Sequence, residues 1–160
     1  MTTIHSYTGD QPTLDRNHKD LYRARSAAQS IIPTSTGAAI SLGEVIPELM
    51  GKIDGMAMRV PTPNVSVIDL KFMANKDTST NEVNEVLTEC SKGKYLNILK
   101  TTNEKLVSMD INHDSHSAVI PLDQTRVTNK KLVRVMAWYD NEWGFSQRMC
   151  DVALHISRLP

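Results

Sequence analysis

The sequence predicts an α+β domain with a mixed, mostly antiparallel sheet, helices on one face and an amphipathic helix at the C-terminal end. Predicted strands outnumber predicted helices and tend to follow one another along the chain, which is typical of this class. The last segment places Phe145, Met149, Val152 and Ile156 on one helical face. No Gly-x-Gly-x-x-Gly and no Walker motif occurs, which disfavours a complete doubly wound nucleotide-binding fold.

Composition suits one soluble globular domain of 160 residues, of which 40% are hydrophobic and 22% charged. Lys plus Arg and Asp plus Glu both number 18, so the chain lacks the charge of a nucleic-acid-binding protein. No apolar run has membrane-spanning length, and no basic-then-apolar leader opens the sequence. Two distant cysteines without metal-ligand spacing favour a reducing compartment. We therefore expect a cytoplasmic protein that binds neither nucleic acid nor membrane.

The first third of the chain predicts a strand, a long loop and a helix. Residues 2–8 are rich in β-branched and aromatic types, whereas residues 9–22 are polar and aperiodic. Small residues follow, and Pro33 ends any helical turn before it. Thr36 and Gly37 precede an Ala-rich helix that runs to about residue 50, interrupted near residue 47. The start of this helix is suited to binding an anion, although a plain N-cap is the commoner alternative.

Arg59 lies on the first of two predicted strands that meet at a Pro-rich corner, residues 61–64. At period two, Met56 and Met58 share one face of this strand and Arg59 falls on the other. We expect the methionines to be buried and the guanidinium to point the opposite way. An arginine on a rigid strand is suited to binding a phosphate or carboxylate, although a surface ion pair is the commoner arrangement.

The rest of the chain predicts a helix, three strands and the terminal helix. Ser79 and Glu82 have capping-box spacing before a helix that ends near Gly93. We also expect strands over 106–111, 117–122 and 132–139, followed by the terminal helix over 142–159.

Two groups of residues resemble a metal site and reactive cysteines, but the sequence supports neither role. His113, Asp114 and His116 form a possible metal-ligand turn, but no fourth ligand is evident, so we expect no metal site. Cys90 falls on an apolar helix face and Cys150 lies beside the terminal stripe. We interpret both cysteines as packing residues.

Four long segments resemble the C-terminal catalytic half of the glyceraldehyde-3-phosphate dehydrogenases. They are Thr3-Ile-His-Ser-Tyr-Thr-Gly-Asp-Gln, Ile31-Ile-Pro-Thr-Ser-Thr-Gly-Ala-Ala, Arg59-Val-Pro-Thr-Pro-Asn-Val-Ser-Val-Ile-Asp-Leu and Trp138-Tyr-Asp-Asn-Glu-Trp-Gly-Phe-Ser. They occur in family order and extend over nearly the whole chain, so the resemblance is far more specific than one short motif.

The resemblance implies a role for each matching residue. His5 matches the catalytic histidine, an acid and base beside a cysteine thiolate, although a histidine on a strand is more often a hydrogen-bonded core residue. Asn141 matches the residue that binds the nicotinamide carboxamide of NAD. Two anion sites are implied as well. Their residues are Thr8 and Arg59 with Asp10 beside them for the phosphate of glyceraldehyde 3-phosphate, and Arg23, Thr36 and Gly37 for inorganic phosphate.

The resemblance also implies an assembly. The loop over residues 9–22 matches an S-shaped loop that lines the core of a homotetramer. The terminal helix over 142–159 would pack against the cofactor domain, which accounts for its apolar stripe.

The departures from the family pattern define the alternatives. The family's nucleophile lies in a Ser-Cys-Thr-Thr-Asn motif upstream of the histidine, and this sequence begins after that point. We therefore expect a fragment that lacks the NAD-binding domain and is inactive alone. The pair Arg16-Asn17 leaves NADP open as the cofactor. An erythrose-4-phosphate dehydrogenase, which resembles the Asn-Glu-Trp-Gly-Phe end, and a non-catalytic assembly or binding module are the alternatives.

Overall fold

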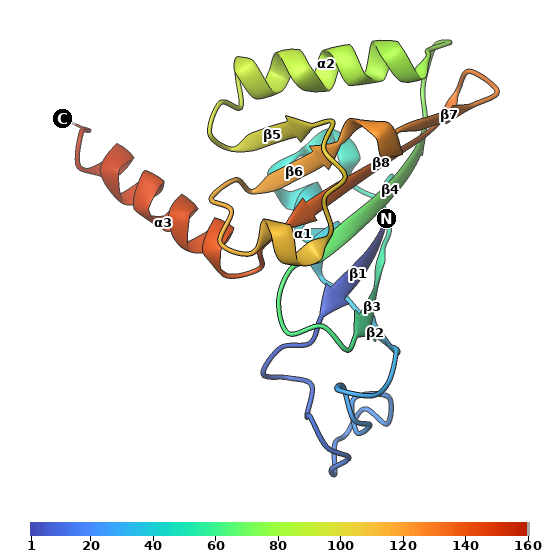
Figure 1. Ribbon diagram of the computed structural model, residues 1–160, viewed down its shortest axis with the longest axis vertical. Helices are drawn as coiled ribbons and strands as arrows, with labels where there is room; N and C mark the ends of the chain where they lie inside the picture. Colours follow the sequence, from blue (N-terminus) through green and yellow to red (C-terminus); the bar gives the residue numbers. More distant parts are fainter. Residues whose placement is uncertain (160) are drawn as a thin grey trace. The chain divides into compact units, whose positions relative to one another are not determined.

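The computed structural model describes residues 1–159, which divide into two compact units with a boundary between Leu70 and Lys71. It contains eight strands and three α-helices, including one at the C-terminal end (Figure 1). Four of the described strand pairings are antiparallel, namely β1–β4, β2–β3, β6–β8 and β7–β8, and the β1–β3 and β5–β6 pairings are parallel. The predicted α+β class with a mixed, mostly antiparallel sheet is confirmed.

The first unit is built on strands in the order β2-β3-β1-β4. Their bounds are β1 Thr2–Ser6, β2 Ile32–Ser35, β3 Met56–Val60 and β4 Ser66–Met73, the last of which continues into the second unit. Strand β2 was not predicted, because Pro33 lies inside it. This proline is tolerated because β2 pairs only with β3 in the described strand order and is therefore an edge strand.

Strand β3 buries a different face from the one the methionine pattern predicts. Ala57 is fully buried, whereas Met56 is 43% exposed. The face that carries Ala57 and Arg59 therefore lies against the interior, and the prediction that the methionines are buried is wrong for Met56.

Helix α1, Ala38–Val45, and a short 3-10 helix, Pro47–Leu49, complete the first unit. The predicted interruption near Pro47 is confirmed. Residues 7–31 contain no α-helix or strand, so the predicted loop over 9–22 is part of a longer irregular segment.

The second unit contains two long helices and the remaining strands. Their bounds are α2 Thr80–Lys92, β5 Leu99–Thr102, β6 Ala118–Pro121, β7 Arg126–Thr128, β8 Leu132–Tyr139 and α3 Trp143–Ile156, with 3-10 helices at Ser108–Ile111 and Leu122–Gln124. The side chain of Ser79 accepts a hydrogen bond from the Glu82 amide at 3.2 Å, which confirms the predicted N-cap of α2. Helix α2 packs along β5 (Figure 1).

The predicted strand over 106–111 is wrong. This segment forms the 3-10 helix Ser108–Ile111, and the strand lies earlier, at β5. The Val107 amide donates to Oδ2 of Asp110 at 2.7 Å. This local bond competes with a strand ladder, as is typical of aspartate near a turn.

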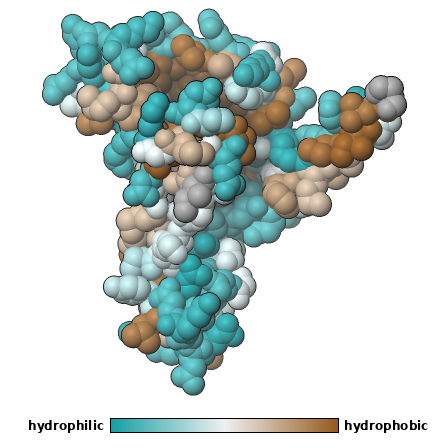
Figure 2. Space-filling model, turned by 180° about the vertical axis from the view of Figure 1, so that it is seen from behind, coloured by the Kyte–Doolittle hydropathy of each residue, from teal (hydrophilic) through white to brown (hydrophobic). Residues whose placement is uncertain are grey.

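Helix α3 exposes most of its apolar side chains. Phe145 is 66% exposed and Ile156 is 60% exposed, and within the described helix only Gly144 is buried. The helix projects from the rest of its unit, and its apolar residues form a brown surface on the arm at the right of Figure 2. Among residues 1–159, no helix is long and apolar enough to cross a membrane.

Candidate functional site

His5 and Arg59 lie opposite each other on two paired strands. Strands β1 and β3 run parallel, and their register places His5 beside Arg59. The two residues are 54 positions apart in the chain, and this register, rather than any local motif, brings them together. Both side chains are partly buried.

Four contacts surround this pair. Nη1 of Arg59 lies 2.8 Å from Nδ1 of His5 and donates a hydrogen bond to the Ser6 carbonyl at 3.1 Å. Nδ1 of His5 lies 2.7 Å from the same carbonyl. Nε of Arg59 lies 3.5 Å from Oγ1 of Thr34 on β2, a buried residue that the sequence interpretation did not identify.

The environment keeps the imidazole of His5 neutral. Burial lowers the pKa of His5 from its ordinary value of 6.5; the Ser6 carbonyl acts in the opposite direction, and the Arg59 guanidinium lowers the pKa further. A neutral imidazole next to a fixed cation can accept a proton from a reacting group.

The lowered pKa of His5 predicts a pH-dependent stability. Because the folded chain binds this proton less tightly than the unfolded chain, the stability that His5 contributes is present above about pH 6.5. It is lost as the pH falls towards the lower folded pKa. Urea unfolding of the chain and of His5→Asn at several pH values between about 7.5 and 5 measures this difference. A difference in unfolding free energy that does not change over this range would contradict the prediction.

Thr8, Asp10 and Arg23 meet around a second buried residue that the sequence interpretation missed, Gln11. The amide and Oγ1 of Thr8 donate to Oε1 of Gln11 at 3.0 and 3.1 Å. Nε2 of Gln11 donates to Asp10 at 3.4 Å, and Asp10 forms an ion pair with Arg23. Arg23 also lies 3.3 Å from Asp20. The sequence offers no signal for this role of Gln11, because the burial and the partners of its side chain depend on how the turn folds.

Thr36 and Gly37 lie at the start of α1. Gly37 is the N-cap residue, and Oγ1 of Thr36 accepts a hydrogen bond from the Ala38 amide at 3.2 Å. Among residues 1–159, no described hydrogen bond or ion pair joins Arg23 to Thr36 or Gly37. The shared phosphate site therefore stays a prediction.

Asn141 is held between β8 and α3 by its buried neighbour Asp140. Oδ1 of Asp140 accepts hydrogen bonds from the Glu142 amide at 3.1 Å and the Trp143 amide at 2.8 Å, and Oδ2 accepts one from the His113 amide at 2.9 Å. Asp140 therefore accepts from two amides at the start of α3 and ties this end of the helix to the loop over residues 112–116. Its role was not predicted, because the partner amide lies 27 residues away.

Loss of the Asp140 carboxylate should destabilise the second unit. Asp140→Ala leaves three backbone amides without this acceptor, and we expect the unfolding free energy to fall by about 1–3 kcal/mol. Asp77→Ala, which removes an exposed partner of Lys130, is the control and should change it by about 0–1 kcal/mol. Equal effects in urea unfolding would disprove the anchoring role of Asp140.

The loop over residues 112–116 is held by ion pairs and ring contacts. Nδ1 of His116 lies 2.6 Å from Asp114, which also pairs with Lys100 at 3.0 Å. The ring of His113 contacts that of Trp143, with centroids 4.4 Å apart. These three side chains therefore have structural partners, and within residues 1–159 no group of three potential metal ligands converges.

The cysteines of the chain are free thiols. Cys90 is half-buried in α2, and Cys150 is exposed on α3.

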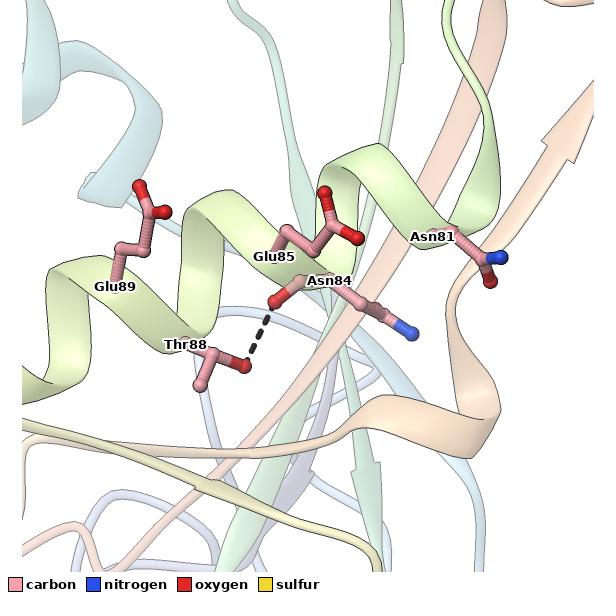
Figure 3. A pocket seen from close by; sticks show the side chains of 5 residues that line it. All are labelled: Asn81, Asn84, Glu85, Thr88 and Glu89. Atoms are coloured by element: carbon pink, nitrogen blue, oxygen red, sulfur yellow. Dashed lines mark hydrogen bonds between the residues drawn. The ribbon is translucent and has the colours of Figure 1, made fainter.

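Two surface hollows lie outside the predicted site. One, of about 330 Å³, is lined only by α2 side chains; Figure 3 shows Asn81, Asn84, Glu85, Thr88 and Glu89 along one side of the helix, with Thr88 bonded to the Asn84 carbonyl. Another, of about 400 Å³, lies in the second unit and includes Phe72, Met73 and Val83. Neither hollow includes a residue of the predicted site.

The geometry of His5 and Arg59 defines a site that combines acid–base chemistry with anion binding. A half-buried, neutral imidazole is fixed beside a guanidinium on neighbouring strands of an α+β domain. This arrangement combines a proton acceptor with a planar cation that suits a phosphate or carboxylate.

Comparison with known proteins identifies the family. The pattern described as "Glyceraldehyde 3-phosphate dehydrogenase, C-terminal domain" matches residues 1–141, so the chain belongs to this family. Glyceraldehyde-3-phosphate dehydrogenases of Cereibacter sphaeroides and Xanthobacter flavus are both 59% identical over 159 residues, which cover 99% of this chain and 48% of each relative. That of Geobacillus stearothermophilus is 52% identical over 157 residues, which cover 98% of this chain and 47% of the relative. The chain thus spans about half the length of the relatives it matches.

Proposed function

We propose that this chain is the substrate-binding and acid–base half of a phosphorylating glyceraldehyde-3-phosphate dehydrogenase. The observation that carries the proposal is the His5–Arg59 pair, because it places a neutral imidazole within 2.8 Å of a guanidinium. Membership of the family supports the same reading.

In this proposal each residue acts on a defined part of the reaction. His5 takes a proton from the carbon-bound oxygen as the aldehyde is oxidised and returns a proton later in the cycle. Arg59, with Thr8, holds the phosphate of glyceraldehyde 3-phosphate and so fixes the aldehyde relative to His5. Arg23, Thr36 and Gly37 receive the inorganic phosphate that becomes the acyl phosphate.

We propose that the cofactor is NAD, and NADP is the alternative. Either cofactor supplies a hydride acceptor when it is bound. The side chain of Asn141 fits such a group, because a carboxamide presents both a donor and an acceptor and can pair with the carboxamide of nicotinamide. Asn141 is partly exposed, and the two amides that follow it in the chain, those of Glu142 and Trp143, are hydrogen-bonded to Asp140.

We also propose a homotetramer in which the loop over residues 9–22 lies at a subunit interface. Leu14, Leu21 and Tyr22 are 73%, 81% and 64% exposed in this loop. Apolar side chains that are so exposed on one segment are typical of an interface. The loop is nevertheless ordered by internal bonds, such as that from the Ser26 amide to Asp15 at 2.7 Å.

Activity of a fused protein tests the proposed function. The half of the Cereibacter sphaeroides relative that precedes the matched region is joined to Met1 of this chain, and NADH formation is followed with glyceraldehyde 3-phosphate and phosphate. We expect turnover by the fused protein and none by the 160-residue chain alone, because the chain offers no cysteine in the family's motif.

The intact relative is the control for the assay and for folding. Turnover by the 160-residue chain alone would refute the role given to His5. A folded tetrameric fusion without turnover would instead favour a non-catalytic binding module. Faster turnover of erythrose 4-phosphate than of glyceraldehyde 3-phosphate would identify erythrose 4-phosphate as the substrate instead.

A further inference from the structure

We infer that Gln11 is a positioning residue for the substrate's phosphate, because its side chain anchors Thr8 and orients the Thr8 hydroxyl. The inference rests on the proposed function, which assigns the phosphate to Thr8 and Arg59. The contacts that carry it all lie in the first unit, in the turn over residues 8–11.

Gln11 binds both the backbone and the side chain of Thr8. Its own amide donates to the Thr8 carbonyl at 2.9 Å. Its Oε1 atom accepts from the Thr8 amide at 3.0 Å and from Oγ1 of Thr8 at 3.1 Å, so both lone pairs of this oxygen are in use. Gln11 is only 3% exposed, and these bonds replace the water that its buried side chain has lost.

The neighbours of Gln11 settle which end of its side chain faces Thr8. The Thr8 amide can only donate a hydrogen bond, so it requires the side-chain oxygen. The carboxylate of Asp10, 3.4 Å from Nε2, can only accept, so it requires the nitrogen. The reversed side chain would place donor against donor and acceptor against acceptor. Gln11 therefore links Thr8 to Asp10, which forms an ion pair with Arg23.

This arrangement prepares Thr8 to donate to a phosphate group. Without a ligand, the hydroxyl hydrogen of Thr8 is directed at Oε1 of Gln11. A phosphate oxygen offers this hydrogen a charge-assisted bond, about twice as strong as one to a neutral amide, so the hydroxyl turns towards the phosphate. Oε1 keeps its bond from the Thr8 amide, and the turn keeps its anchor. Because Thr8 is already ordered, less conformational freedom is lost when the substrate binds.

A double-mutant cycle on Gln11 and Thr8 tests the inference. Calorimetric titration of the 160-residue chain measures its affinity for glycerol 3-phosphate. Gln11→Met keeps the length of the side chain without its hydrogen-bonding groups, and it should lower this affinity by about 3- to 10-fold, the value of one hydrogen bond. Thr8→Val removes the hydroxyl and keeps the branched shape. In the Thr8→Val background, Gln11→Met should lower the affinity by less than about twofold, because the hydroxyl that Gln11 orients is already absent.

Two further measurements separate positioning from a general loss of structure. Gln29→Met, which replaces an exposed glutamine of the same irregular segment, is the matched control and should retain the parent affinity. In the fused enzyme, Gln11→Met should raise the KM for glyceraldehyde 3-phosphate and leave kcat/KM for glyceraldehyde without phosphate unchanged. A general loss of structure would lower both rates.

Gln11→Glu completes the cycle if Gln11→Met does not fold, because a carboxylate still accepts from both groups of Thr8. Its charge-assisted bond competes with the phosphate for the Thr8 hydroxyl, and its charge repels the phosphate. We therefore expect it to weaken binding, and to do so less in the Thr8→Val background, where only the repulsion remains.

Parent affinity in folded Gln11→Met, or an equal loss of affinity in both backgrounds, would overturn the inference. Turnover by the fused protein with such an uncoupled cycle removes only the inference. A coupled cycle with an inactive fused protein removes the proposed catalysis and leaves phosphate positioning by Gln11. A folded chain that does not bind glycerol 3-phosphate removes both.

Discussion

Replacing His5 by Asn in the fused enzyme should lower kcat by about 10²- to 10⁴-fold, the usual contribution of a positioned general acid–base group. Asparagine keeps a polar side chain on β1 but accepts no proton near neutral pH. The KM for glyceraldehyde 3-phosphate should change little, because the proposed function assigns the phosphate to Arg59 and Thr8 and not to the imidazole. Steady-state rates of NADH formation measure both constants.

His155→Asn is the matched control, since His155 is an exposed histidine in the last turn of α3. It should leave kcat unchanged. If His5→Asn retained the parent kcat, or if both variants lost activity equally, His5 would not be the acid–base residue.

Replacing Arg59 by Leu should raise the KM for glyceraldehyde 3-phosphate by about 10- to 100-fold. The lost interaction is a hydrogen-bonded charge pair, which is worth about 1.5–3 kcal/mol. In addition, kcat should fall, because a substrate held less firmly is oriented less well towards His5.

Arg126→Leu, which removes an exposed guanidinium from β7, is the control and should change neither constant. The substrate's own phosphate is the second control. Glyceraldehyde without phosphate should be used equally poorly by the parent fusion and by Arg59→Leu. A larger loss for Arg59→Leu with glyceraldehyde than with glyceraldehyde 3-phosphate would contradict phosphate binding by Arg59.

Long, regular patterns in the sequence predicted their elements well. Strand β8 was predicted over the residues it occupies, because its eight successive residues are mostly apolar and include no Pro or Gly. Helix α2 begins where Ser79 predicted it, since capping depends only on residues three apart.

Short or mixed segments could not be predicted in the same way. Strand β5 has four residues and includes Lys100, and it is stabilised by its parallel neighbour β6 rather than by its own pattern. Residues 106–111 alternate like a strand, but the Asp110 side chain favours a local turn. A tertiary partner stabilises β5 and a local hydrogen bond favours the turn over residues 107–110, and neither follows from the hydrophobic pattern.

The candidate site could also be predicted only in part, because local patterns identify residues but not their contacts. The residue types at 5 and 59 were identified from the sequence, and the pattern placed both on strands. Their contact required the parallel register of β1 and β3, which no local signal encodes. Thr34 and Asp140 were missed because Arg59 and the His113 amide lie 25 and 27 positions away from them in the chain. Gln11 lies close to Thr8 and Asp10 in the sequence, but its contacts with them depend on how the turn folds.

Binding of glycerol 3-phosphate to the 160-residue chain tests the central claim most directly. This compound has the substrate's phosphate but no aldehyde, so calorimetric titration reports binding without chemistry. We predict that it binds the unmodified chain more tightly than glycerol does, and that Arg59→Leu removes the difference while Arg126→Leu retains it. Equal affinity for glycerol and glycerol 3-phosphate in a folded unmodified chain would contradict the account.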